Sequence, residues 1–126
     1  MKNFWGGLTG TMLAIGTSYG TVQVKNFYLM NPQVTDGGET VIIASTTDYL
    51  ITYDTLQSSF WIGLPADQFA TLRPVAEQQL VSMLGLNQSD ACKLTVSISA
   101  FYAPSSSLNT QSLPLSFCGN GGSLSK

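Results

Sequence analysis

Histidine is absent from the sequence, which has 126 residues. This absence excludes catalytic triads with an imidazole base, histidine-ligated metals and imidazole proton relays. Cysteine is scarce as well, because Cys92 and Cys118 are the two in the chain and neither has a second cysteine at the spacing of a zinc-binding pair. We therefore expect neither a metal site nor a bound cofactor.

Charged side chains are also scarce, at 10% of residues, compared with about 25% in typical soluble proteins. The five cationic residues are scattered, and two of them lie at the chain ends, so no basic stripe can follow a phosphate backbone. We expect no direct binding to nucleic acid. A low charge also weakens the repulsion between copies of a protein, which makes their association easier.

Few residues remain that could support catalysis. The close carboxylate pairs bracket a predicted turn (Asp36 and Glu39) or flank a predicted strand, and both are ordinary positions for solvated carboxylates. Ser123 and Lys126 have a Ser-x-x-Lys spacing, but they follow a glycine-rich segment at the end of the sequence. We therefore predict that the protein is not an enzyme.

Cys92 and Cys118 are predicted to form a disulfide within the chain. Such a bridge would stabilise the fold by about 3 kcal/mol according to the chain-entropy account of loop closure. It would also indicate an oxidising compartment or the outside of a particle. Two alternatives stay open, namely separate buried thiols in a reducing compartment and bridges between chains. The expected location is extracytoplasmic: a virion, a cell surface or the secreted fraction.

The stretch between Lys2 and Lys25 carries no charge, which is compatible with a leader peptide or a membrane segment. Glycines and threonines interrupt it, and it has neither a dense Leu/Ile run nor a convincing small-x-small cleavage site. We therefore expect no membrane insertion of residues 3–24. The predicted organisation is a single domain over 1–126, with a glycine-rich segment at 1–11 and a Ser/Gly-rich tail at 104–126.

Apolar residues alternate with polar ones along much of the chain, which predicts half-buried strands. Asp36-Gly37-Gly38 supplies residues that tolerate the backbone of a tight reversal. The last predicted strand alternates most regularly, as expected for an antiparallel strand with one buried face. We predict an α+β, mainly β fold built on an antiparallel sheet of about five or six strands. The candidate strands are residues 12–16, 22–28, 40–44, 49–53, 59–62 and 93–103.

One principal amphipathic helix is predicted at about residues 67–84, packed on the sheet. Pro74 lacks an N–H, so either a short turn precedes a helix with Pro74 in its first turn, or the helix is kinked. Gly85 suits a left-handed cap, with Leu86 folding back on Val81. The residues expected on the buried stripe are Phe69, Leu72, Ala76, Leu80 and Met83.

Adjacent pairs of aromatic residues occur in three of the predicted strands. Consecutive side chains of a strand point to opposite faces, so both faces of the sheet carry large apolar groups. One helix covers one face, and the other face must meet a second layer of this chain or a neighbouring subunit. The interface candidates are Trp5, Phe27, Tyr28, Phe60, Trp61, Phe101 and Tyr102.

The function predicted from these features is that of a non-catalytic structural subunit. It would self-assemble or dock into a larger assembly, such as a virion capsid, a decoration layer or an extracellular filament, with copies of itself or other structural subunits as partners. The alternative is a monomeric secreted or periplasmic binding module with an aromatic-lined groove. An assembly would bury Trp5 and Trp61 between chains, whereas a binding module would leave one of them at the mouth of a pocket.

Overall fold

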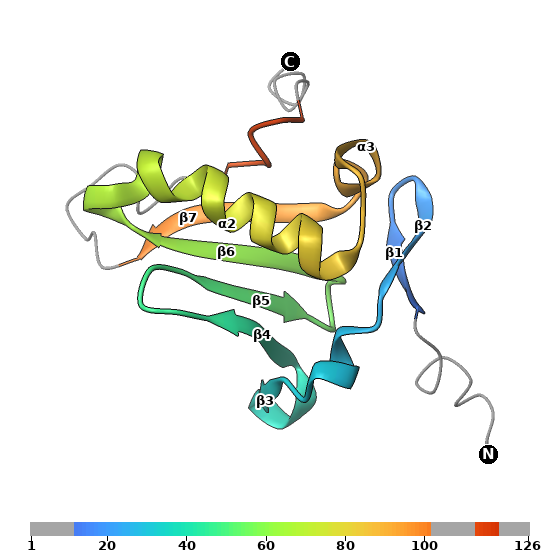
Figure 1. The fold of residues 1–126 in the computed structure, drawn as a ribbon. Helices are drawn as coiled ribbons and strands as arrows, with labels where there is room; N and C mark the ends of the chain where they lie inside the picture. The colour runs from blue at the N-terminus through green and yellow to red at the C-terminus, as the bar shows by residue number, and fades with distance from the viewer. Residues whose placement is uncertain (1–11, 102–112, 119–126) are drawn as a thin grey trace.

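The computed structural model describes residues 12–101 and 113–118, apart from the side chains of Asp36 and Phe101. Within these residues, seven strands form two sheets, and one long helix lies across the larger sheet (Figure 1). The predicted α+β, mainly β fold is therefore confirmed.

The smaller sheet is an antiparallel hairpin of β1 (Met12–Thr17) and β2 (Gly20–Lys25), joined by a turn at Ser18 and Tyr19. The larger sheet has five strands in the order β3-β4-β5-β6-β7. Its first four strands pair antiparallel along the chain. The five strands are β3 (Gln33–Thr35), β4 (Thr40–Ser45), β5 (Leu50–Asp54), β6 (Ser59–Pro65) and β7 (Thr95–Phe101).

Strand β7 pairs with β6 in parallel, so the predicted antiparallel pairing of the last strand was wrong. The long helix that follows β6 returns the chain to the end at which β6 began, and Thr95 of β7 lies beside Ser59. A helical crossover of this kind joins strands that run in the same direction. Alternation of side chains identifies a half-buried strand but carries no information about its direction.

The predicted strand 22–28 ends early, at Lys25, because Asn26 caps a short 3-10 helix, η1 (Phe27–Met30). The Asn26 side-chain oxygen accepts a hydrogen bond from the Tyr28 backbone N–H at 3.0 Å. Asparagine side chains often offer the backbone such an alternative to the strand ladder. Tyr28 is therefore in a helical turn and not in a strand.

Two further short elements differ from the prediction. The turn expected at 87–90 is one turn of helix, α3 (Gln88–Ala91), because the Asn87 side chain accepts a hydrogen bond from the Asp90 N–H at 2.7 Å. Strand β3 was not predicted at all, since a three-residue segment following Pro32 is too short to show a period.

Helix α2 (Phe69–Leu84) is preceded by a 3-10 turn, η3 (Ala66–Gln68). The predicted opening turn is thus present, but Pro74 lies five residues after Phe69 and not in the first turn of the helix. Because Pro74 has no N–H, it cannot donate a hydrogen bond to the carbonyl of Ala70, one turn earlier. Both residues lie on the exposed side of the helix, where water can bind that carbonyl.

The buried face of α2 and its end follow the sequence prediction. Phe69, Leu72, Ala76 and Leu80 are buried, and Met83 is half-buried. Gly85 has a positive φ of 69°, and its N–H reaches the Ser82 carbonyl at 3.2 Å. The Leu86 N–H bonds to the Val81 carbonyl at 3.1 Å, which completes a Schellman cap.

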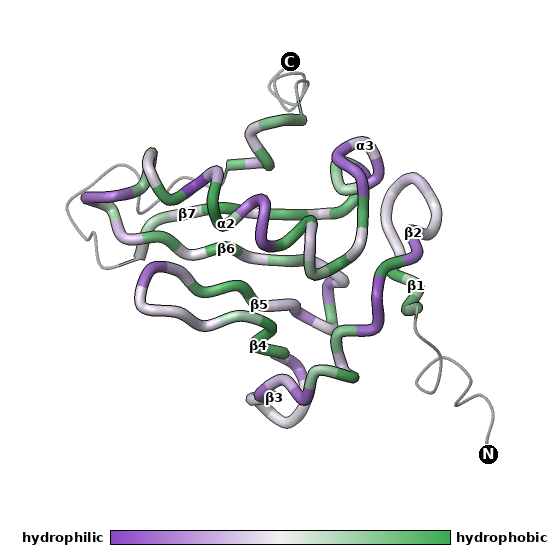
Figure 2. The backbone as a smooth tube through the Cα atoms, in the orientation of Figure 1, coloured by the Kyte–Doolittle hydropathy of each residue, from purple (hydrophilic) through white to green (hydrophobic). Residues whose placement is uncertain are grey.

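The hydrophobic core lies between α2, one face of the five-stranded sheet and the β1–β2 hairpin. Figure 2 shows hydrophobic stretches on β6 and β7 where α2 crosses them. An aromatic group closes the core near η1, where the Phe27 ring lies 5.3 Å from Tyr53 and 6.2 Å from Phe60 between centroids. The helix thus packs on one face of the sheet and forms the core with it.

The Gly85 cap gives a first testable prediction. We expect Gly85→Ala to lower the free energy of unfolding by about 1 kcal/mol, because a left-handed φ strains any residue with a Cβ. The added Cβ would also lie 2.9 Å from the Lys25 Cγ, so that side chain must shift. Gly16→Ala is the matched control, since Gly16 is in a strand with no atom within 4 Å of the added Cβ. Chemical denaturation of both variants measures the effect, and equal stabilities would contradict it.

Candidate functional site

The face of the five-stranded sheet turned away from α2 is the first candidate site. Along β5, and along β6 as far as Ile62, the residues alternate between buried and half-buried, so one face contributes to the core and the other stays partly accessible. We call this second face the outer sheet face. All its half-buried members are uncharged except Asp54, which lies at the end of β5. They are Thr40, Ile42, Leu50, Thr52, Asp54, Ser59, Trp61, Ser97 and Ser99.

Trp61 lies at the middle of the outer sheet face. Strand pairing places Thr52 on one side of it and Ser97 on the other, with Ile42 next to Thr52. The indole Nε1 donates a hydrogen bond to the Ser99 Oγ at 2.8 Å, which fixes the direction of the ring across β7. Around Trp61 the face therefore combines apolar area with hydroxyl groups. Its carboxylate, that of Asp54, lies at the end of β5 and accepts hydrogen bonds from the backbone N–H groups of Leu56 and Gln57.

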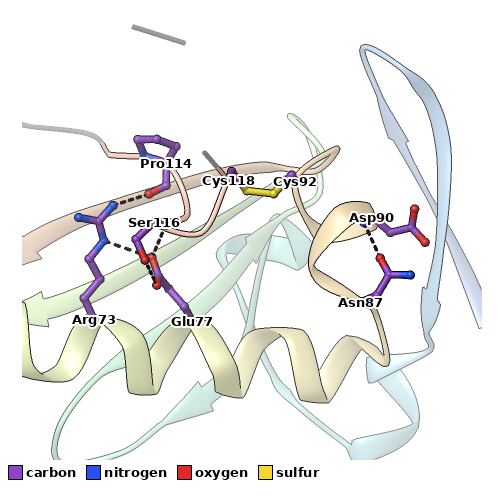
Figure 3. The surroundings of a disulfide bond; sticks show 8 residues. All are labelled: Arg73, Glu77, Asn87, Asp90, Cys92, Pro114, Ser116 and Cys118. Atoms are coloured by element: carbon purple, nitrogen blue, oxygen red, sulfur yellow. Dashed lines mark hydrogen bonds and ion pairs between the residues drawn. A yellow bond between two sulfur atoms is a disulfide. The ribbon is translucent and has the colours of Figure 1, made fainter. Parts of the chain in front are cut away.

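A short segment near the C-terminus, residues 113–118, is the second feature of interest, and we call it the strap (Figure 3). Leu113 exchanges two backbone hydrogen bonds with Ile98 of β7, at 2.8 and 2.9 Å. Leu115 inserts into the core and is 2% exposed. Cys118 forms a disulfide with Cys92, with 5.5 Å between their Cα atoms. This is the intrachain arrangement that the sequence favoured.

Glu77 of α2 anchors the strap by its carboxylate, which is 2% exposed. It accepts hydrogen bonds from the Ser116 N–H at 2.7 Å and from the Ser116 Oγ at 2.5 Å. The Arg73 Nε donates to the same carboxylate at 3.1 Å, and its terminal nitrogen donates to the Pro114 carbonyl at 2.6 Å (Figure 3). The buried charge is thus paired and hydrogen-bonded, as a carboxylate inside a protein must be.

Sequence reasoning missed this anchor. Arg73 and Glu77 stand four residues apart on the predicted helix, and this spacing is the signal by which the pair itself could have been found. The role of the pair in holding the strap could not have been predicted, because Ser116 lies 39 residues beyond Glu77 along the chain.

Two of the predicted interface residues are core residues of the chain itself, which corrects the prediction for them. Phe27 is 0% exposed and Phe60 is 1% exposed, because both rings pack against Tyr53 on the face that α2 covers. Trp61 lies on the outer sheet face, and Tyr28 is half-buried in η1. The backbone of Phe101 belongs to β7, but its side chain and the residues Trp5 and Tyr102 lie outside the described part of the chain.

A shallow hollow of about 560 Å³ lies on the solvent side of α2. Its described lining has neither an aromatic nor a charged side chain, so it does not resemble the aromatic groove expected of a binding module. The two charges of the helix, Arg73 and Glu77, are turned towards the strap. The lining residues are Pro74, Val75, Gln78, Gln79 and Ser82.

Residues 12–101 and 113–118 contain no group of three or more acidic, cysteine or histidine side chains that could hold a metal ion. Among the helices of that same part, none has the length and hydrophobicity needed to cross a membrane. Comparisons with protein-family models, with curated proteins and with solved structures found no match to this chain. Its function must therefore be inferred from the outer sheet face and the strap.

The Glu77 anchor predicts a large loss of stability when the carboxylate is removed. We expect Glu77→Ala to lower the free energy of unfolding by about 3 kcal/mol, because it leaves the Ser116 N–H and the Arg73 side chain without their buried acceptor. Asp90→Ala is the control, since the pair of Asp90 with Lys93 is about half exposed and should cost less than about 1 kcal/mol. Similar losses in urea denaturation would contradict a special role for Glu77.

Tyr28 predicts a dependence of stability on alkaline pH. Burial, and secondly the neighbouring Tyr53, raise the pKa of the Tyr28 phenol above its ordinary value of 10.0. The unfolded chain therefore loses this proton first as the pH rises, and stability falls from about pH 10 upwards. We expect the fall to be smaller in Tyr28→Phe, whereas Tyr19→Phe, at a residue 76% exposed, should match the unaltered chain. Denaturation between about pH 9 and 11 tests this, and identical slopes in all three proteins would refute it.

Proposed function

We propose that the chain is a non-catalytic structural subunit that assembles with copies of itself, or docks into a larger assembly, through its outer sheet face. The observation that carries the proposal is the one-sided cover of the sheet. Among the residues that the structure describes, helix α2 and the strap pack on one side, while the opposite side presents Ile42, Leu50 and Trp61 with hydroxyl side chains next to them.

The composition of the outer sheet face supports contact with another protein surface. The centres of protein interfaces are depleted of charged residues and enriched in aromatic ones. Trp61 is of the residue type that most often dominates binding energy when a partner removes it from water. Charged residues make up only 10% of the chain, so electrostatic repulsion between copies is weak.

The disulfide supports a place outside the cytoplasm. Bridges such as that of Cys92 with Cys118 persist in oxidising surroundings and are rare where cellular thiols keep cysteines reduced. A capsid or decoration protein of a virion and a subunit of a surface filament both satisfy this condition.

A charge placed on the outer sheet face should prevent assembly. We expect Thr52→Lys, beside Trp61, to convert larger species into a monomer of 13.5 kDa, because a partner would have to bury the ammonium group. Thr71→Lys on the exposed side of α2 is the matched control, with the same change of residue and charge. Light scattering over a concentration series gives the mass of each protein.

Two outcomes would count against the proposal. A monomeric mass of the unaltered chain at every concentration would eliminate self-assembly, and equal effects of Thr52→Lys and Thr71→Lys would eliminate the outer sheet face as the contact. Circular dichroism of both variants verifies that the lysine has not unfolded the sheet.

A further inference from the structure

Helix α2, strand β7 and Cys92 form the docking site of the strap. Ile98 of β7 supplies the backbone partner, Glu77 and Arg73 of α2 supply the polar anchor, and Cys92 supplies the bridging sulfur. The residues joined by these contacts are separated by 15 positions for Ile98 and Leu113, by 26 for the disulfide and by 41 for Arg73 and Pro114. The strap of another copy carries the same groups and could make the same contacts.

The connection to the strap is long enough to allow this. Residues 102–112 separate the end of β7 from Leu113. Eleven residues can span up to about 40 Å when extended. This length exceeds what is needed to reach the neighbouring edge of the same strand, so the covalent connection does not restrict the strap to its own chain.

We infer that the strap is an exchange element: residues 113–118 of one copy dock on α2 and β7 of a second copy, and Cys118 of the first bridges Cys92 of the second. The inference rests on the proposed function, because exchange matters for a chain that assembles. Exchange of identical elements preserves every contact of the strap, so its main cost is the loss of freedom on association. Contact through the outer sheet face would offset that cost.

The number of disulfides does not change in the exchange. A small-molecule thiolate, such as that of glutathione, attacks one sulfur of the intrachain bridge and releases the other as a thiolate. The released Cys118 attacks the equivalent mixed disulfide on Cys92 of the second copy and expels the small thiol. Two intrachain bridges become two interchain bridges, with no net oxidant. One-way exchange along a row of copies gives a covalent chain, and reciprocal exchange gives a dimer.

A complementary pair of single-cysteine variants tests the exchange directly. The donor, Cys92→Ala with an affinity tag, retains Cys118 on its strap, and the acceptor, Cys118→Ala, retains Cys92 beside its docking site. They are mixed with reduced and oxidised glutathione. As the two protein thiols join, one molecule of the oxidised form accepts their two electrons and two protons and becomes two molecules of the reduced form. We expect a tagged heterodimer of twice 13.5 kDa on a non-reducing gel.

The Glu77 anchor distinguishes docking from random oxidation. Glu77→Gln in the acceptor should lower the yield of heterodimer about tenfold, because the acceptor's carboxylate binds the donor's Ser116. The same substitution in the donor should leave the yield unchanged or raise it, because it loosens the donor's own strap. Ser116→Ala gives the opposite pattern, with the loss in the donor.

The two proposals fail separately. Exchange is overturned when no heterodimer forms, or when Glu77→Gln has the same effect in donor and acceptor. This conclusion holds even where light scattering finds an assembly that Thr52→Lys abolishes, which would support the proposed function alone. A heterodimer with the asymmetric response to Glu77→Gln supports exchange, including in a protein whose assembly does not respond to Thr52→Lys.

Discussion

Helix α2 buries its apolar stripe against one face of the five-stranded sheet, and three other features depend on that contact. The helix returns the chain to the start of β6, so β7 must pair in parallel. Its length places Arg73 and Glu77 beside the outer edge of β7, where the strap docks. In residues 12–101 and 113–118, the helix layer packs on one face, and the side chains on the outer sheet face are half-buried.

The strap depends in turn on a buried charge. Moving a carboxylate out of water is costly, and the cost is offset here by two hydrogen bonds from Ser116 and one from Arg73. Position 77 requires a hydrogen-bond acceptor, because an apolar side chain there would leave the Ser116 N–H without a partner. Leu115 adds buried apolar area next to the anchor. The strap is therefore held by packing and polar contacts as well as by the disulfide.

The sequence predicted those parts of the fold that are encoded by neighbouring residues. The period of α2 and the left-handed cap at Gly85 are local properties, and both were found correctly. The direction of β7 and the partner of Glu77 depend on residues far away, and the alternation or spacing of nearby side chains does not contain them. Competition between local structures accounts for the early end of β2, where Asn26 bonds to the backbone and starts η1.

The candidate site was predicted in part for a related reason. Adjacent aromatic residues show that large groups point to both sides of a strand, but they do not show which member faces the helix. In β6 the buried member is Phe60, and Trp61 lies on the outer sheet face. The same argument does not apply to Phe27, whose segment is a 3-10 helix. Pairing in strands supports an interface prediction only where the strand itself has been located.

The low charge of the chain connects the two proposed surfaces. The charges of α2 are engaged with the strap, so the solvent side of the helix is uncharged around Val75, as is the outer sheet face around Trp61. In the proposed assembly, repulsion between these two surfaces would contribute little to the orientation of the copies, and shape and hydrogen bonding would have to set it. The strap meets that requirement, because a segment anchored by Glu77 and locked by a disulfide would fix the register between copies that uncharged surfaces leave loosely specified.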